Sequence, residues 1–153
     1  MIGNWYSARI VYDKVKENGD EKPVKENYLV KALTFGEAER RIIDEMKPFI
    51  SGSFAVTKLQ LEVYQEIFRN DAEWADKWFR AKVGFVTLDE TRGKEKMNYS
   101  MMLVQSDSTD NALKALHGGM KGTLSDYRVK SISETDYMDI YDYTLEAETE
   151  ETR

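Results

Sequence analysis

The segments WYSARIVY at residues 5–12 and WFRAKVGF at residues 78–85 decide the fold, because each reads as the same strand. In both segments apolar side chains alternate with polar ones, which is the period-2 pattern of a half-buried strand. The apolar positions are Tyr6, Ala8, Ile10 and Tyr12 in the first segment and Phe79, Ala81, Val83 and Phe85 in the second. Two matched strands in the two halves of one chain predict an internal repeat.

Further matches follow in the same order along the chain. YLVKALTFGEA (28–38) aligns with MLVQSDSTDNA (102–112), MKPFIS (46–51) with MKGTLS (120–125), and FAVTKLQLEVYQEIF (54–68) with YRVKSISETDYMDIY (127–141). Because the matches keep their order and cover most of both halves, we expect a tandem duplication with repeats at about residues 3–69 and 76–142. Both repeats end in a Tyr-x-x-Ile-aromatic motif, which predicts a shared packing role, with an oligomer contact as the alternative.

Each repeat reads as strand, hairpin, strand, helix and strand. Asn18-Gly19 is typical of a hairpin turn, and residues 90–93 occupy the same place in the second repeat. Second strands are expected near residues 25–33 and 97–106, and third strands near 54–63 and 127–134.

Capping signals mark both helices. Thr34 and Glu37 form a T-x-x-E capping box, and Pro48 ends the helix that follows. A second helix is expected to begin near Ser108 and to run out at the glycines Gly118, Gly119 and Gly122.

These elements predict an α+β fold of two ββαβ units, with about six strands and two helices, packed as one pseudo-twofold-symmetric domain over residues 1–145. NDAEWADKW (70–78) is expected to form a short helical linker capped by Asn70, with Trp74 buried. The acidic residues 146–153 are expected to form a flexible tail.

Composition narrows the function classes. The 153 residues are 41% hydrophobic and 33% charged, which is typical of one soluble globular unit. No segment has the length of a membrane helix or the layout of a signal peptide, so we expect a cytoplasmic protein. The net charge of −6, concentrated toward the C-terminus, disfavours a duplex nucleic-acid binder.

Few residues are suited to catalysis or metal binding. The chain has no cysteine, and His117 is its single histidine, so thiolate and multi-histidine metal sites are excluded and no cofactor is expected. The G-x-S-x-G, Walker A, Rossmann and H-E-x-x-H motifs are absent. The sequence therefore disfavours an enzyme without excluding one, and His117 reads as a residue at a helix end.

Two groups of residues are candidates for ligand binding. In the first, Lys47 and Lys121 lie at matching points after the helices and are followed by hydroxyl groups and glycines, a combination that can hold an anion. This candidate anion site consists of Lys47, Ser51, Lys121, Thr123 and Ser125. The alternative interpretation is that the lysines complement the helix dipoles and the glycines end the helices.

The second group lies on the outer sheet face, where basic and aromatic residues could stack with bases of a nucleic acid. It consists of Arg9, Lys82, Trp5 and Trp78. The alternative interpretation is that the basic residues discourage edge aggregation and the tryptophans cap the core.

The tryptophan that opens each first strand, the segment YLVKALTFGEAERRIIDEMKPFISG (28–52) and MKGTLSDY (120–127) resemble a family of small proteins of unknown function from Bacteroides-type gut bacteria and their phages. The resemblance extends to about Tyr141. It implies a cytoplasmic protein of bacterial or phage origin and assigns a role to no residue.

We therefore expect a non-catalytic binding module that engages a protein partner or an anionic small molecule such as a nucleotide. In a phage, such a module would suit a counter-defence factor. The alternative is a nucleic-acid-associated protein that uses the outer sheet face. Membrane partners are not expected, and self-association into a homo-oligomer stays open.

Overall fold

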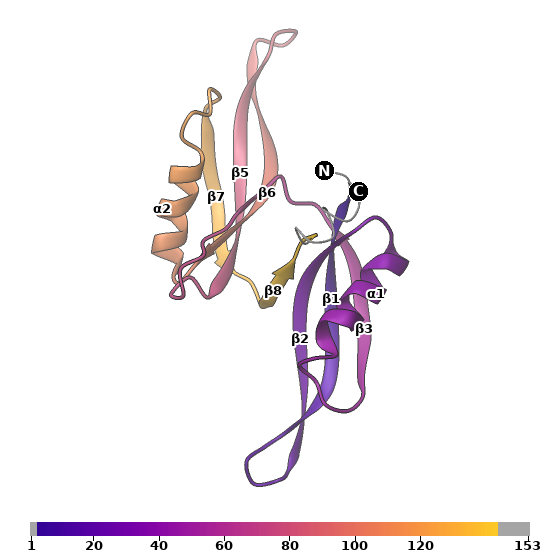
Figure 1. Cartoon of the computed structure of the whole chain (residues 1–153). Helices are drawn as coiled ribbons and strands as arrows, with labels where there is room; N and C mark the ends of the chain where they lie inside the picture. Colours follow the sequence, from indigo (N-terminus) through magenta and orange to yellow (C-terminus); the bar gives the residue numbers. More distant parts are fainter. Residues whose placement is uncertain (1–2, 144–153) are drawn as a thin grey trace, which may run out of the picture. The chain divides into compact units, whose positions relative to one another are not determined.

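The computed structural model describes residues 3–143, which form eight strands in two four-stranded sheets together with two helices (Figure 1). The mixed α/β architecture is confirmed, but the expected number of six strands is wrong. The additional strands are β4 (Glu66–Phe68) and β8 (Tyr137–Tyr141); β8 contains the Tyr-x-x-Ile-aromatic ending of the second repeat, and β4 contains the last three residues of the ending of the first. Strands of three and five residues are too short to show a periodic pattern, so the sequence did not mark them.

Residue contacts separate the described chain into two compact units. Unit 1 contains residues 3–63 and 137–143, and unit 2 contains residues 64–136. The packing of both repeats about a pseudo-twofold axis stays a prediction.

Unit 1 is a four-stranded sheet in the order β3 (Phe54–Glu62), β1 (Asn4–Val15), β2 (Glu21–Ala32), β8. β1 is antiparallel to both β2 and β3, whereas β8 is parallel to β2. Helix α1 (Phe35–Met46) covers one face of this sheet (Figure 1). The predicted second and third strands are confirmed, although β2 begins earlier than expected.

Unit 2 repeats this order with β7 (Tyr127–Glu134), β5 (Lys77–Asp89), β6 (Lys94–Ser106) and β4, covered by α2 (Thr109–Gly119). The registers also correspond. The pairing of β1 with β3 shifts between Arg9 and Ile10, and the pairing of β5 with β7 shifts between Lys82 and Val83. Equivalent positions in the two units can therefore be compared directly from the pairing.

The fourth strand of each sheet comes from the other half of the sequence. β4 follows β3 along the chain but pairs in parallel with β6, and β8 follows β7 but pairs in parallel with β2. Each unit therefore contains one strand from the other half of the sequence: unit 1 contains β8 and unit 2 contains β4. A parallel neighbour cannot be joined by a tight hairpin, so a long connection of this kind is required.

Each unit buries its own apolar core between the sheet and the helix. The alternation predicted for the first strands is confirmed, because Tyr6, Ala8 and Ile10 are buried in unit 1. In unit 2 the matching residues Phe79, Ala81 and Val83 are buried as well. On the helices, Ala38, Ile42 and Met46 of α1 and Ala112 and Leu116 of α2 face these cores. Burial of apolar side chains contributes the main stabilisation of such units.

Both predicted helix caps are confirmed. The Thr34 hydroxyl accepts a hydrogen bond from the Glu37 N–H at 3.1 Å, and the Ser108 hydroxyl accepts one from the Asn111 N–H at 3.2 Å. Each bond satisfies a backbone donor that the first turn of a helix leaves free.

The expected helical linker is wrong. Residues 69–76 form a turn in which the Asn70 side chain accepts a hydrogen bond from the Ala72 N–H at 3.0 Å. A second bond joins the Ala75 N–H to the Ala72 carbonyl at 3.0 Å, and Trp74 is 55% exposed. An Asn side chain that satisfies the backbone two residues on favours a turn over a helix in so short a segment.

Two other expectations concern the chain ends and membranes. The predicted acidic tail, residues 146–153, lies outside the described residues. Neither α1 nor α2 is long and apolar enough to cross a membrane, a finding that applies to residues 3–143.

Candidate functional site

The two lysines of the predicted anion site lie at helix ends in different units. Lys47 caps α1, its Nζ lies 3.5 Å from Asp44 Oδ1, and its side chain is 66% exposed. Lys121 follows α2 and is exposed, as are Ser51, Thr123 and Ser125. The helix-end interpretation accounts for Lys47, because its cation already pairs with an acidic neighbour one turn away. An anion site shared by both lysines stays a prediction.

The predicted basic and aromatic sheet face is wrong at its aromatic positions. Trp5 is 9% exposed and Trp78 is 3% exposed, so neither ring offers the open face that base stacking requires. Arg9 and Lys82 are half-buried. The Arg9 Nε donates to Asn27 Oδ1 at 3.4 Å, and the Lys82 Nζ lies 4.8 Å from the Tyr99 ring centroid.

His117 lies in the last turn of α2, as expected for a residue at a helix end. Its Nδ1 is 2.8 Å from the Tyr127 hydroxyl oxygen, and the two ring centroids are 5.8 Å apart. This pair joins the end of α2 to the start of β7. It is an exposed contact between two neighbouring elements and calls for no catalytic role.

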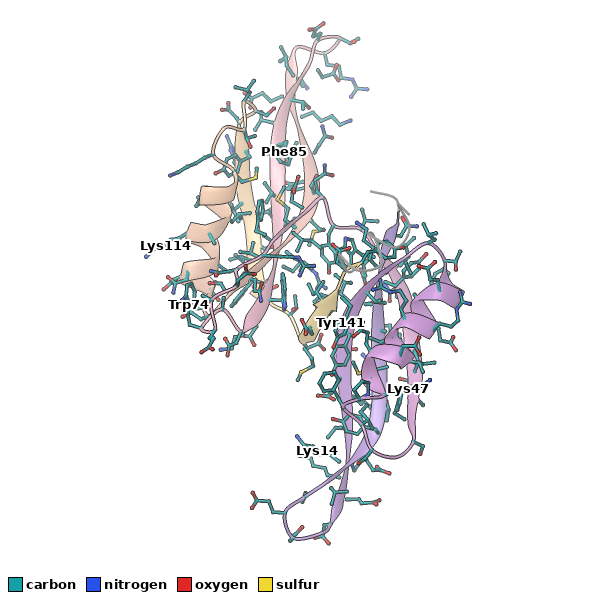
Figure 2. All side chains as sticks on the ribbon, in the orientation of Figure 1. Lys14, Lys47, Trp74, Phe85, Lys114 and Tyr141 are labelled. Carbon is teal, nitrogen blue, oxygen red and sulfur yellow. The ribbon has the colours of Figure 1, made fainter. Side chains whose placement is uncertain are left out.

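The structure reveals a group of polar aromatic residues that the sequence did not single out. We name it the tyrosine–carboxylate cluster, and it lies in unit 1 on the helix-covered face of the sheet. The Tyr28 and Tyr141 rings stack with centroids 5.9 Å apart at 24°, and Tyr141 is labelled on β8 in Figure 2. The members of the cluster are Tyr12, Tyr28, Tyr141, Glu26, Glu45 and Asp139.

Pairing between strands positions these side chains. Tyr28 on β2 lies opposite Ala8 on β1 and Asp139 on β8, while Tyr12 lies opposite Val24. Alternate residues of a strand share a face, so Glu26 and Tyr28 both point toward the side that α1 covers. Tyr28 is buried, whereas Tyr12, Tyr141, Glu26 and Glu45 are half-buried and Asp139 is exposed.

Negative charge surrounds the three phenols. A hydrogen bond from the Tyr12 hydroxyl to Glu26, followed by burial and the charge of Glu26, raises the pKa of Tyr12 to about 12. Burial, followed by the charges of Asp139, Glu45 and Glu26, raises the pKa of Tyr141 to about 12. Burial and then Glu26 raise the pKa of Tyr28 as well. Glu26 acts on all three phenols, so it lies at the centre of the cluster.

No cation within residues 3–143 neutralises this charge. Neither Glu26, Glu45 nor Asp139 lies within ion-pair distance of a lysine, arginine or histidine of that part of the chain. Asp139 accepts a hydrogen bond from the Ile140 N–H at 2.8 Å. Over the same residues, no three acidic or histidine side chains converge closely enough to hold a metal ion.

Unit 2 has apolar residues at the positions of the three tyrosines. By sheet register, Phe85, Met102 and Phe68 stand where unit 1 has Tyr12, Tyr28 and Tyr141. Phe85 is labelled on β5 in Figure 2. At the end of α2, a Cβ added to Gly119 would meet the Phe68 ring at 2.5 Å, so this ring packs directly against the helix backbone. A residue-by-residue comparison of the two repeats would have shown that the three tyrosines have apolar counterparts, and this difference could have drawn attention to the cluster.

A second feature of unit 1 is an apolar patch near the start of α1. Phe35 is 51% exposed, and its ring contacts the buried Tyr6 edge-on with centroids 4.8 Å apart. Leu61, 46% exposed, pairs with Tyr6 across the strands, and Val63 follows β3 with 77% exposed. We name Phe35, Leu61 and Val63 the apolar patch.

Unit 2 has polar residues at the positions that correspond to this patch. Glu134 pairs with Phe79 as Leu61 pairs with Tyr6, and Thr109 is the first residue of α2 as Phe35 is of α1. Both polar residues are exposed, as is Asp136, which occupies the place of Val63. The two units therefore share their backbone plan and differ in the chemistry of both ends of the helix.

A known protein family matches nearly all of the residues that the structure describes. Residues 4–143 match the model of a family described as a domain of unknown function (DUF4494), so the chain belongs to that family. The match begins at the first residue of β1 and ends just beyond β8. No curated protein matches the sequence.

Proposed function

We propose that this chain is a non-catalytic binding module that engages a protein partner through the apolar patch of unit 1. The observation that carries the proposal is the exposure of Phe35, which contacts the Tyr6 ring, of Leu61, which pairs with Tyr6, and of Val63, which follows β3. Contiguous apolar side chains at the surface are typical of sites where proteins associate. An aromatic side chain such as Phe35 contributes large contact area at an interface.

The comparison between units supports a functional origin for this patch. The same fold in unit 2 has Thr109 and Glu134 at the corresponding positions. The fold therefore does not require apolar residues at these positions, because unit 2 has the same fold with polar ones. In a phage, a module of this kind would suit a counter-defence factor that blocks a host protein.

We also propose that the two units descend from one duplicated segment. Three features support this: the strand order is the same in both sheets, the registers shift at matching positions, and both helices begin at a capping hydroxyl residue. Duplication would explain how one copy could keep a polar surface while the other acquired an apolar one.

The binding proposal is tested by replacing the patch with its counterpart from unit 2. The double variant F35T/L61E is compared with the wild-type full chain as bait in extracts of its own host, with co-purifying partners identified by mass spectrometry. We expect a protein retained by the wild type to bind the variant at least about tenfold more weakly in a calorimetric titration with the purified partner.

The variant E134Q in unit 2 serves as the matched control and should retain the partner. Because Phe35 and Leu61 are both about half exposed, the double variant should keep its fold, which the thermal midpoint checks. Undiminished partner binding by F35T/L61E would contradict the proposal. Co-purification of a nucleotide in place of a protein would also contradict it and would favour an anionic ligand.

A further inference from the structure

We propose that two copies of this chain form a dimer by pairing the outer edges of their β3 strands antiparallel to each other, about a two-fold axis at Gln60. The inference rests on the proposed function, because it identifies the protein that covers Leu61 of the apolar patch as a second copy of the chain. The dimer would join the unit 1 sheets of both copies into one continuous sheet.

β3 has an open edge that another strand can occupy. It is the terminal strand of its sheet, and within residues 3–143 it pairs with β1 alone (Figure 1). Alternate backbone N–H and C=O groups of an edge strand point away from the sheet, where they can bond an added strand. The bulge of β3 lies before Lys58, so residues 58–62 form a regular stretch beyond it.

This regular stretch, KLQLE, is complementary to itself in the antiparallel direction. Pairing about Gln60 places Lys58 opposite Glu62 of the second copy and Leu59 opposite Leu61 of the second copy. The two-fold axis repeats both pairs. Opposite charges and apolar side chains that face each other across two strands stabilise the pairing.

The members of each pair also lie on the same face of the sheet. Leu59 and Leu61 pair with core residues of β1, so they lie on the face that α1 covers. Lys58 and Glu62 alternate with the leucines and lie on the other face. Leu61 is 46% exposed, so the helix leaves it open to a neighbouring chain.

The two charged side chains lack ion-pair partners in their own chain. Neither Lys58 nor Glu62 forms an ion pair within residues 3–143. Lys58 lies opposite Arg9 of β1, and like charges that face each other across strands are destabilising. Glu62 accepts a hydrogen bond from the Ser7 hydroxyl at 3.0 Å, which orients its carboxylate. Glu62 of a second copy beside Lys58 would offset the repulsion.

The edge strand of unit 2 does not have this complementarity. β7 has Glu134 at the position of Leu61, so the same pairing would place Ile132 opposite an acidic side chain of the second copy. β7 also exposes Arg128 and Lys130. Charged residues on an edge strand oppose pairing with another chain. The contrast favours β3 as the pairing edge.

The test measures the mass of the full chain by sedimentation equilibrium over a range of protein concentrations. The wild type should rise from 17.8 kDa toward twice that mass. K58E and E62K should each dimerise about tenfold more weakly, because both cross-strand pairs become repulsive. An equimolar mixture of K58E and E62K should restore the dimer, since every such pair in the mixed dimer is again oppositely charged.

Controls separate dimerisation from folding. K130E makes the same charge change on the edge of unit 2 and should leave the dimer unchanged. Thermal midpoints check that each variant is folded. Should E62K unfold, K58Q and K58E replace the mixture, and dimerisation should weaken in that order. A dimer that K58E does not weaken, as expected if the copies associate elsewhere, would overturn the inference.

Failure of this inference differs from failure of the proposed function. A wild type that stays monomeric overturns the inference at once. If that monomer retains another protein from the extract and F35T/L61E loses it, the proposed function stands. If the monomer retains no protein, both fail.

Discussion

At the scale of the residue, the hydroxyl groups of Tyr12 and Tyr141 distinguish these positions of unit 1 from those of unit 2. Tyr12 and Tyr141 of unit 1 correspond to Phe85 and Phe68 of unit 2, and the charges of Glu26 and Asp139 act on the added hydroxyl groups. A phenol next to a carboxylate resists ionisation, because the second negative charge is repelled and the hydrogen bond favours the neutral form. A few side chains therefore change the electrostatics of a surface while the backbone stays the same.

Because of this environment, we expect unit 1 to lose stability at alkaline pH. The pKa values of Tyr12 and Tyr141 are raised from 10.0 to about 12 in the folded chain. A group whose folded pKa is raised contributes stability that is complete below its unfolded pKa and is lost as pH rises through the folded value. We expect the urea concentration at the unfolding midpoint to decrease as the pH rises from 10 to 12. The variant E26Q should make this decrease smaller.

The measurement is phenolate absorbance followed alongside circular dichroism. Tyr12 and Tyr141 should ionise only well above pH 10, in step with unfolding. Ionisation of every tyrosine near pH 10 with the fold intact would contradict the raised values.

At the scale of the element, α1 holds the exchanged strand β8 in place through Arg41. The Arg41 guanidinium donates to the Lys31 carbonyl of β2 and, at 2.8 Å, to the Asp142 carbonyl just after β8. It also lies 4.9 Å from the Tyr143 ring centroid, and the Tyr143 hydroxyl donates to Glu37 Oε1 at 3.1 Å. A strand of five residues at the edge of a sheet gains much of its order from such contacts.

We predict that Arg41→Ala will accelerate amide hydrogen exchange in β8 by about tenfold or more. The reason is that hydrogen bonds from a charged donor contribute about 1.5–3 kcal/mol each to the closed state. Arg40→Ala is the control, because Arg40 is the exposed neighbour on the same helix. Exchange in β4, which belongs to unit 2, should not change. Equal protection of β8 in both variants would show that Arg41 does not hold the strand.

At the scale of the whole molecule, the exchange of β4 and β8 joins the two halves of the sequence by backbone hydrogen bonds as well as by the chain itself. β4 is covalently part of the first half but pairs with β6, and β8 is part of the second half but pairs with β2. The turn at residues 69–76 is the covalent connection between the halves. Exchanged elements of this kind are the usual basis of domain swapping between protein copies.

We predict that cutting this turn will not release the halves. A protease site in place of residues 71–74 of the full chain allows cleavage after folding, and the two fragments should elute together in size-exclusion chromatography. I67P/I140P removes a backbone donor from each exchanged strand, and its fragments should separate. The cut chain without these prolines is the reference for that variant. Separation of its fragments would contradict a stable exchange.

Much of the fold was predictable where the signal is local. The alternation along the first strands, the Thr34 and Ser108 caps and the third strands agree with the structure, because each depends on a few neighbouring residues. The prediction that Trp74 is buried was wrong, because burial depends on residues that are distant in the sequence. An isolated apolar ring in a polar segment does not reveal whether a core lies within its reach.

The candidate site was less predictable, because what a side chain can bind depends on its burial and on its neighbours in the folded chain. Trp5 and Trp78 suggested an open stacking surface, yet both rings are buried. Tyr12, Glu26 and Asp139 are far apart in the sequence and lack any shared motif, so only strand pairing brings them together.

The sequence by itself determined the class of elements, their order and the two helix starts, because alternation and capping act over a few residues. Only the tertiary structure decided which sheet receives β4 and β8. Both strands are too short to carry a pattern, and each pairs in parallel with a strand remote in sequence, where side-chain fit and loop closure outweigh local propensity. That same exchange places Asp139 and Tyr141 beside Tyr28 and so creates the tyrosine–carboxylate cluster.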